Sequence, residues 1–212
     1  MEATATAKRK KTEEKIPAYL IKEVLDGVPV YYKGYRDVLN KTKKFEEIMA
    51  DSSLQAIIKT WLTFLLYGPM DARNYWLFAG EVGSHLAHKN NLAHDLAIYE
   101  TSRLPPSKIG AKYIDVPAKI VIEIDAEVEY GRGKKVEDYV HQKTQRVLDF
   151  GTEKVIWIFT ASRKIMVATP GEDWRTFDWN RDVEVLDGVT FNIARFLEEK
   201  KIVLPSEEEE SF

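Results

Sequence analysis

Residues 119–125 read Lys119-Ile120-Val121-Ile122-Glu123-Ile124-Asp125, an apolar run of the kind that forms a buried strand. In the segment that follows, residues 134–150, apolar side chains recur at helical spacing, and Gly151 is placed to end that helix. A second apolar run, Val155–Phe159, comes next. Strand, helix and strand in this order predict a crossover unit within a sheet.

Segments on both sides of this unit extend the same sheet. The Asp26-Gly27 dipeptide separates two short apolar runs and predicts a β-hairpin with a type I′ turn. A long amphipathic helix is expected over 53–67, capped by a residue among 51–53, and a last helix near Asn192. Further strands are expected at Tyr75–Ala79, Leu92–Tyr99, Ile165–Ala168, Trp174–Trp179 and Val183–Leu186. The sequence predicts an α+β fold with an α/β-like core, one mixed sheet flanked by helices and β-hairpin additions.

The length predicts a single domain, since 212 residues correspond to roughly 1.4 domains at about 150 residues each. Residues 1–15 carry a basic run and residues 205–212 end in four consecutive glutamates, so both are expected to be disordered tails. Residues 16–204 are then the folded domain. The Pro- and Gly-containing stretch 104–117 is expected to be a surface loop within it.

The composition limits the classes of chemistry. The chain has no cysteine, which excludes disulfides, thiolate zinc sites, iron–sulfur clusters and a cysteine nucleophile, so a metal would need oxygen or imidazole ligands. The net charge of -3 excludes a uniformly basic surface but not a local basic groove. Residues 1–15 contain no apolar core of a signal peptide, and the longest apolar stretch, residues 61–67, is too short to span a membrane. A cytoplasmic protein without a membrane partner is expected.

Acidic residues interrupt two of the predicted strands. Alternation places Asp95 on one face with Ala97 and Tyr99, and makes Glu123 and Asp125 point together. Carboxylates at the ends of neighbouring strands can share Mg²⁺, which prefers oxygen ligands, and a lysine such as Lys135 could orient a metal-bound water. Spacing alone leaves two interpretations open, a metal site and a set of solvated strand-end acids.

A series of motifs over residues 20–200 resembles the Uma2 family, also called DUF820, of restriction endonuclease-like proteins in the PD-(D/E)XK nuclease superfamily. The matching segments are Glu23-Val24-Leu25-Asp26-Gly27, the helix 53–67, Gly80-Glu81-Val82-Gly83, His94-Asp95-Leu96-Ala97-Ile98, Ile120-Val121-Ile122-Glu123-Ile124, Lys135 with Tyr139, and Gly151 to Phe159. The resemblance implies a restriction endonuclease-like fold.

The resemblance also implies a phosphodiesterase site that uses a divalent metal. Asp95 and Glu123 would bind Mg²⁺ or Mn²⁺, with the backbone carbonyl of Ile124 as a further ligand. Asp125 departs from the family pattern and could either strengthen this cation site as an additional ligand or, without a counter-charge, spoil it. The superfamily normally has a lysine two residues after the second acid, where this chain has Asp125. Lys135 would take its place on the following helix, and Glu81 would be an auxiliary acid.

This sequence departs from the family pattern in ways that keep a second function open. His94 stands where the family has proline before the first acid. The hypothesis is a metal-dependent endonuclease acting on DNA, as a monomer or homodimer; the alternative is an inactive nuclease-fold module that binds nucleic acid or a protein. Basic residues near the proposed site could neutralise a nucleic-acid backbone; they are Arg132, Lys134, Lys135, Lys143 and Arg146. Lys143 and Arg146 are expected on a solvated helix face.

Overall fold

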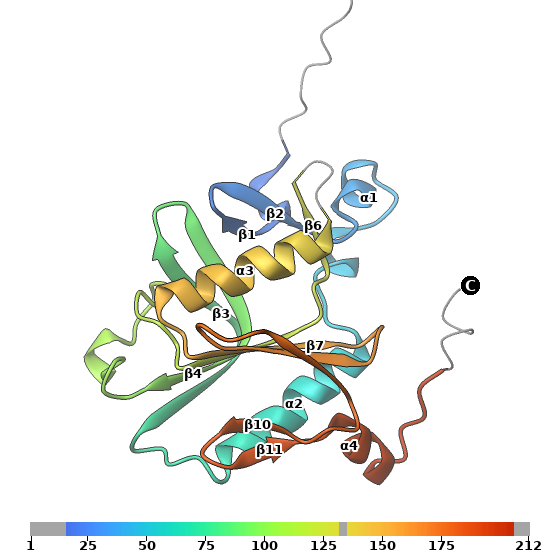
Figure 1. The fold of residues 1–212 in the computed structure, drawn as a ribbon. Helices are drawn as coiled ribbons and strands as arrows, with labels where there is room; N and C mark the ends of the chain where they lie inside the picture. Colours follow the sequence, from blue (N-terminus) through green and yellow to red (C-terminus); the bar gives the residue numbers. More distant parts are fainter. Residues whose placement is uncertain (1–15, 132–134, 206–212) are drawn as a thin grey trace, which may run out of the picture.

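The computed structural model describes residues 16–131 and 135–205, so the expected tails lie outside the described residues apart from Pro205. Figure 1 shows the elements in their arrangement. The strands are β1 Ile21–Leu25, β2 Val28–Tyr32, β3 Tyr75–Ala87, β4 Asn90–Glu100, β5 Ile120–Ile124, β6 Val128–Tyr130, β7 Lys154–Phe159, β8 Lys164–Ala168, β9 Arg175–Asp178, β10 Val183–Leu186 and β11 Val189–Phe191. The α-helices are α1 Tyr35–Leu39, α2 Ser53–Tyr67, α3 Val136–Phe150 and α4 Ile193–Glu199, and short 3₁₀ turns lie at Ala18–Leu20, Phe45–Glu47 and Pro106–Lys108.

One mixed sheet organises the described residues. Its strands follow the order β6-β2-β1-β4-β5-β7-β8-β9, and β3 pairs with β4 outside this path. β5 and β7 are parallel neighbours, joined through α3, which confirms the predicted crossover unit. The predicted hairpin is confirmed as β1 and β2, with positive φ angles at Asp26 and Gly27. The predicted α+β class with one mixed sheet is therefore correct.

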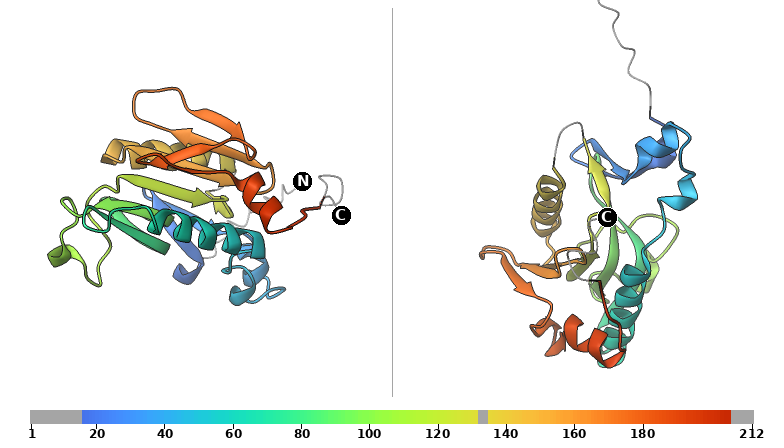
Figure 2. Two further views of the ribbon diagram at one scale, coloured as in Figure 1. Left: turned by 90° about the horizontal axis from the view of Figure 1, so that it is seen from below. Right: turned by 90° about the vertical axis from the view of Figure 1, so that its right-hand side faces the viewer.

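The helices cover the two faces of the sheet separately. Figure 2 shows α3 on one side and α2 with α4 on the other. The core under α2 and α4 includes Leu96 and Ile98, whereas the core under α3 includes Ala97 and Tyr99. Alternation along this part of β4 is therefore as predicted. Within the described residues, every helix is too short or too polar to traverse a lipid bilayer.

The strands β4 and β5 separate at the position where the acids stand. Their last paired residues at this end are Leu96 and Ile122. At the next positions the Ile124 N–H donates a hydrogen bond to the Asp95 carboxylate at 2.7 Å instead of to the backbone of β4. The same carboxylate reaches Lys59 of α2, the helix over the opposite face from Ala97. The prediction that Asp95 shares a face with Ala97 is therefore wrong, because regular alternation ends where the strands part.

Two parts of the sheet were not expected from the sequence. β3 extends past Ala79 to Ala87, because an irregularity between Ala79 and Val82, with Gly80 at φ 111°, lets the strand continue its pairing with β4. β6 is only three residues long and pairs with β2. Residues 104–117 form the expected connection between β4 and β5, in which Ile114 bridges to β3. Gly80 interrupts the alternation of polar and apolar residues in β3, and β6 is too short to show such an alternation, so neither could be predicted from the sequence pattern.

The start of α2 provides a test of the helix boundary. Ser52 is the N-cap, and its hydroxyl accepts a hydrogen bond from the Gln55 N–H while the Gln55 side chain accepts one from the Ser52 N–H. We expect Ser52→Ala to lower the free energy of unfolding by about 1 kcal/mol, because it leaves an N–H without its partner. Urea denaturation measures this loss. Ser53→Ala is the matched control and should be neutral; equal losses in the two variants would contradict the cap.

Candidate active site

A small cavity opens where β4 and β5 separate. Its volume is about 10 Å³, the space of about one water molecule. Four carboxylates and two lysines contribute to its wall. The lining residues are Lys22, Glu81, Ala93, His94, Asp95, Glu123, Asp125, Ala126, Val128, Tyr139 and Lys143. The structure thus brings four of the predicted site residues to one place: Glu81, Asp95, Glu123 and Asp125.

Glu123 lies buried at the end of β5, between two groups that stabilise its charge. Its Oε1 atom is 2.7 Å from Nδ1 of His94 and 3.1 Å from Nζ of Lys143. Because a carboxylate only accepts hydrogen bonds, Nδ1 of His94 carries the hydrogen. Burial alone would raise the pKa of Glu123, but Lys143 and His94 outweigh it and lower the pKa. Glu123 is therefore an ionised carboxylate, a suitable ligand for a cation.

Lys143 extends from α3 into the cavity wall and is 2% exposed, so the expectation that it lies on a solvated helix face is wrong. Its ammonium donates to the Ala93 carbonyl at 2.7 Å, to Glu23 Oε2 at 3.1 Å and to the Tyr139 hydroxyl at 3.2 Å. Burial would lower the pKa of Lys143, but the charges of Glu123 and Glu23 outweigh it and raise the pKa well above its ordinary value. The buried ammonium therefore remains charged.

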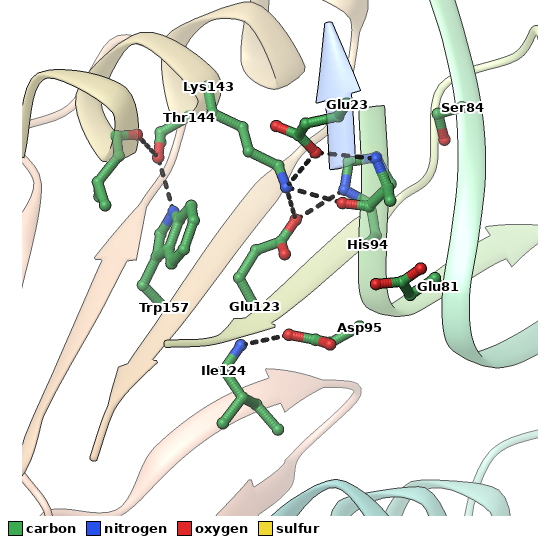
Figure 3. A network of polar contacts seen from close by, with 12 residues as sticks. Glu23, Glu81, Ser84, His94, Asp95, Glu123, Ile124, Lys143, Thr144 and Trp157 are labelled. Atoms are coloured by element: carbon green, nitrogen blue, oxygen red, sulfur yellow. Dashed lines mark hydrogen bonds and ion pairs between the residues drawn. The ribbon is translucent and has the colours of Figure 1, made fainter. Parts of the chain in front are cut away.

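Glu23 comes from the opening hairpin and lies against the other side of this ammonium (Figure 3). It is buried on β1, where it also accepts hydrogen bonds from the Ala93 N–H at 3.1 Å and the Tyr139 hydroxyl at 2.8 Å. Burial and the charge of Glu23 together raise the pKa of Tyr139 well above its ordinary value. Tyr139 therefore acts as a hydrogen-bond donor and not as an anion.

Asp95 stands at the fork of the two strands, across the cavity from this network (Figure 3). Its Oδ1 atom is 2.8 Å from Nζ of Lys59, which also pairs with Asp51 at 2.6 Å. Burial and the nearby charge of Glu123 raise the pKa of Asp95, although Lys59 and the Ile124 N–H oppose this shift. A cation between Asp95 and Glu123 would relieve this repulsion.

The other predicted ligands have different surroundings. Glu81 lines the cavity but is half exposed, and its nearest basic partner is Lys22 at 3.8 Å. Asp125 also lines the cavity, yet its φ is 59° and its two oxygens accept hydrogen bonds from Thr160, both at 2.6 Å. Glu123 and Asp125 thus line the same cavity, but β5 ends between them and the Asp125 carboxylate is hydrogen-bonded to Thr160. The roles of Asp125 and of the Ile124 carbonyl as metal ligands stay predictions.

Lys135 lies away from the cavity. It is the exposed N-cap residue of α3, and among the described residues it does not line the cavity wall. Arg146 is exposed as expected and pairs with Asp26 at 2.9 Å. Arg132 and Lys134 fall outside the described residues. The lysine of α3 that the structure brings to Glu123 is Lys143, two turns after Lys135.

Three members of the site were not assigned from the sequence, although two leave a signal in it. Lys143 stands four residues from both Tyr139 and Val147, so helical periodicity places it on the buried stripe of α3. Glu23 stands two residues before buried Leu25 and therefore shares its face of β1. Lys59 leaves no such signal, because its partner is set by the packing of α2 against the sheet.

The donor set fits a hard divalent cation in its chemistry. Within residues 16–131 and 135–205, no group of three or more histidines or acids is arranged to hold a metal. Mg²⁺ commonly takes only one or two protein carboxylates and completes its octahedron with water and substrate phosphate. Asp95 and Glu123 can supply those two carboxylates, both on the wall of one cavity. Their present partners, Lys59 and Lys143, neutralise part of the charge that a cation would meet.

Comparisons with known proteins bear on the fold. Neither the family models nor the curated proteins that were searched match this sequence. Its structure is similar to the crystal structure of a "putative nuclease belonging to DUF820" from Anabaena variabilis ATCC 29413, with a TM-score of 0.55 and 16% identity over 70% of this chain and 82% of that chain. A cryoEM structure of a DrdV–DNA complex also matches, with a TM-score of 0.36 and 14% identity over 68% of this chain and 11% of that chain. The first similarity confirms the restriction endonuclease-like fold that the motifs implied.

Proposed function

We propose that this protein is a divalent-metal-dependent nuclease that hydrolyses phosphodiester bonds in DNA. The observation that supports this most is the meeting of Asp95, Glu123 and Lys143 on the wall of one cavity at a fork between two strands. The three residues come from β4, β5 and α3. Two acids can hold a divalent metal that activates a water, and a lysine can stabilise the charge that develops on the phosphate.

Each residue has a role that follows from its environment. Asp95 and Glu123 would hold Mg²⁺ or Mn²⁺, which when bound lowers the pKa of a water and screens the phosphate oxygens. Lys143 is charged and fixed by three hydrogen bonds, so it can stabilise negative charge that develops on the phosphate beside Glu123. His94 holds Glu123 in place through Nδ1. Glu81, half exposed at the rim, is an auxiliary acid that would face incoming solvent or substrate.

A cleavage assay tests the function. The protein is incubated with supercoiled plasmid, linear duplex, single-stranded DNA and RNA, each with Mg²⁺, with Mn²⁺ and with EDTA. Metal-dependent nicking or fragmentation of DNA is the expected result. Cleavage that persists in EDTA would contradict metal dependence, and cleavage of RNA alone would contradict the assignment to DNA.

One observation favours a second function, a nuclease-fold module that binds nucleic acid without cleaving it. Both proposed ligands already have lysine partners, and every buried side-chain nitrogen and oxygen in the described residues has a hydrogen-bond partner. Such a satisfied site has no need of a cation for its stability. The same preparations therefore go into a gel-shift assay. DNA binding without cleavage in either metal, together with no Mn²⁺ binding by calorimetry, would favour the binding module over the nuclease.

The assignment of the lysine can be tested separately. We expect Lys135→Ala to retain cleavage within about twofold, since an exposed side chain outside the cavity adds little to the transition state. The variant keeps the backbone hydrogen bond from the Lys135 N–H to Asp138 and so keeps the start of α3. Initial rates at saturating DNA measure the effect. A loss of tenfold or more in Lys135→Ala would restore Lys135 as the functional lysine and remove Lys143 from that role.

A further inference from the structure

The opening hairpin contributes a buried carboxylate, Glu23, to which neither the motifs nor the proposed chemistry assigns a role. Glu23 belongs to β1, which joins the sheet beside β4, whereas Asp95 and Glu123 come from β4 and β5. Its side chain is 1% exposed, so a charge there needs compensation. All of its contacts lead to the site: the Ala93 N–H, the Tyr139 hydroxyl and the Lys143 ammonium.

We propose that Glu23 is a positioning residue that holds the Lys143 ammonium at the cavity wall, so that the β1–β2 hairpin is part of the active site. This inference rests on the proposed nuclease function. Glu23 and Glu123 each lie 3.1 Å from Nζ of Lys143, and so the ammonium is shared between one carboxylate inside the hairpin and one that lines the cavity. Figure 3 shows the ammonium between these two side chains.

The sharing has a geometric consequence. With Glu123 as its only charged partner, a flexible lysine side chain would close on that carboxylate and occupy the place of a cation. Glu23 pulls the ammonium from the other side, and the Ala93 carbonyl and Tyr139 hydroxyl fix its remaining direction. Lys143 therefore stays beside Glu123 without covering it, so that Glu123 still lines the cavity.

Glu23 also attaches the hairpin to α3, so its role in positioning Lys143 must be distinguished from a purely structural role. Asp26 offers a matched control on the same hairpin. Its carboxylate accepts hydrogen bonds from α3 as well, from Gln142 at 2.6 Å and Arg146 at 2.9 Å, but it does not contact Lys143. If Glu23 only attaches the hairpin, then Glu23→Gln and Asp26→Asn should have the same consequences.

Two measurements on the full chain test the proposal. The first follows the ammonium ¹H–¹⁵N signal of Lys143 in metal-free protein, identified by its loss in Lys143→Arg. The second measures kcat and KM for DNA cleavage with Mg²⁺. We expect Glu23→Gln to shift or broaden the signal and to lower kcat about tenfold with KM within about twofold, the range for loss of a supporting contact. Asp26→Asn should change neither, although it lowers the melting temperature. Glu23→Asp, which keeps the charge on a shorter side chain, should retain the signal and recover part of kcat.

The outcomes separate this proposal from the function on which it rests. An unchanged ammonium signal in Glu23→Gln, with wild-type kcat, overturns the positioning role while the nuclease stands. If wild-type protein does not cleave, the nuclease proposal fails, and the ammonium signal alone decides for or against Glu23. Should Glu23→Gln not fold, Glu23→Asp decides by its rate: a kcat between that of inactive protein and that of the wild type supports the proposal, and a wild-type kcat contradicts it.

Discussion

Asp95→Asn should abolish DNA cleavage while leaving the fold intact. Asparagine keeps the oxygen that accepts the Ile124 N–H but carries no charge for a cation, so we expect kcat to fall by about 10³-fold or more. Glu123→Gln should give a loss of the same size. Plasmid cleavage at saturating Mg²⁺ measures both, and calorimetric titration with Mn²⁺ should show weaker metal binding in each variant.

The stability of Asp95→Asn distinguishes a functional acid from a structural one. The raised pKa of Asp95 means that the folded state disfavours its charge, so a neutral isostere should keep the free energy of unfolding within about 1 kcal/mol of the wild-type value. Asp178→Asn is the control, because Asp178 also belongs to a strand and pairs with a lysine, Lys164, but lies outside the cavity. Wild-type cleavage by Asp95→Asn would remove the proposed site.

Lys143→Met should destabilise the protein by about 3–5 kcal/mol near neutral pH, because it leaves the buried carboxylates of Glu23 and Glu123 without their shared cation. Cleavage should be lost as well. Urea denaturation in EDTA measures the stability. Lys119→Met is the matched control: Lys119 also joins two carboxylates, Glu100 and Glu153, but these are partly exposed, and we expect a loss of less than about 1 kcal/mol.

The pH dependence of this loss has a definite sign. In the wild type the pKa of Glu123 is lowered, so its contribution to stability is present above its unfolded pKa and disappears as the pH falls through its folded pKa. Without Lys143, burial should raise the pKa of Glu123, and the variant should gain stability as protons bind. The difference between the two proteins should therefore shrink from about pH 8 to about pH 5. A difference that is constant over this range would contradict the buried ion pair.

Much of the fold could be predicted because local signals and tertiary structure agree. The Asp26-Gly27 turn, the capping residue Ser52 and the helix-ending Gly151 each determine a boundary through backbone chemistry. The apolar runs of β5 and β7, with a helical pattern between them, predict parallel strands joined by a crossover helix, and α3 is this helix. The loss of regular pairing between β4 and β5 at Asp95, just before Leu96, could not be predicted in this way, since it depends on how the two strands separate in the folded sheet.

The site was only partly predictable for the same reason. Asp95 and Glu123 could be chosen because an acid within an apolar strand is unusual, and the structure brings both to one cavity. The motif indicates Lys135, whereas the lysine buried at the site is Lys143. The position of Lys143 on the apolar stripe of α3 conflicts with the usual exposure of lysine, so the sequence pattern alone does not select it. The contact of His94 with Glu123 depends on the fork and has no local signature.

The contacts of Glu23 also have a bearing on how the molecule is assembled. Its hydrogen bonds to Tyr139 and Lys143 join residues that are 116 and 120 positions apart in the chain. Contacts of such long range form only after the intervening chain has been ordered, since closing so large a loop costs entropy that local structure must first offset. The buried charges therefore find their partners only when the hairpin and α3 have both docked on the sheet. Until then, Glu23 and Lys143 remain hydrated and separate, and an incompletely folded chain has no assembled site with which to act on nucleic acid.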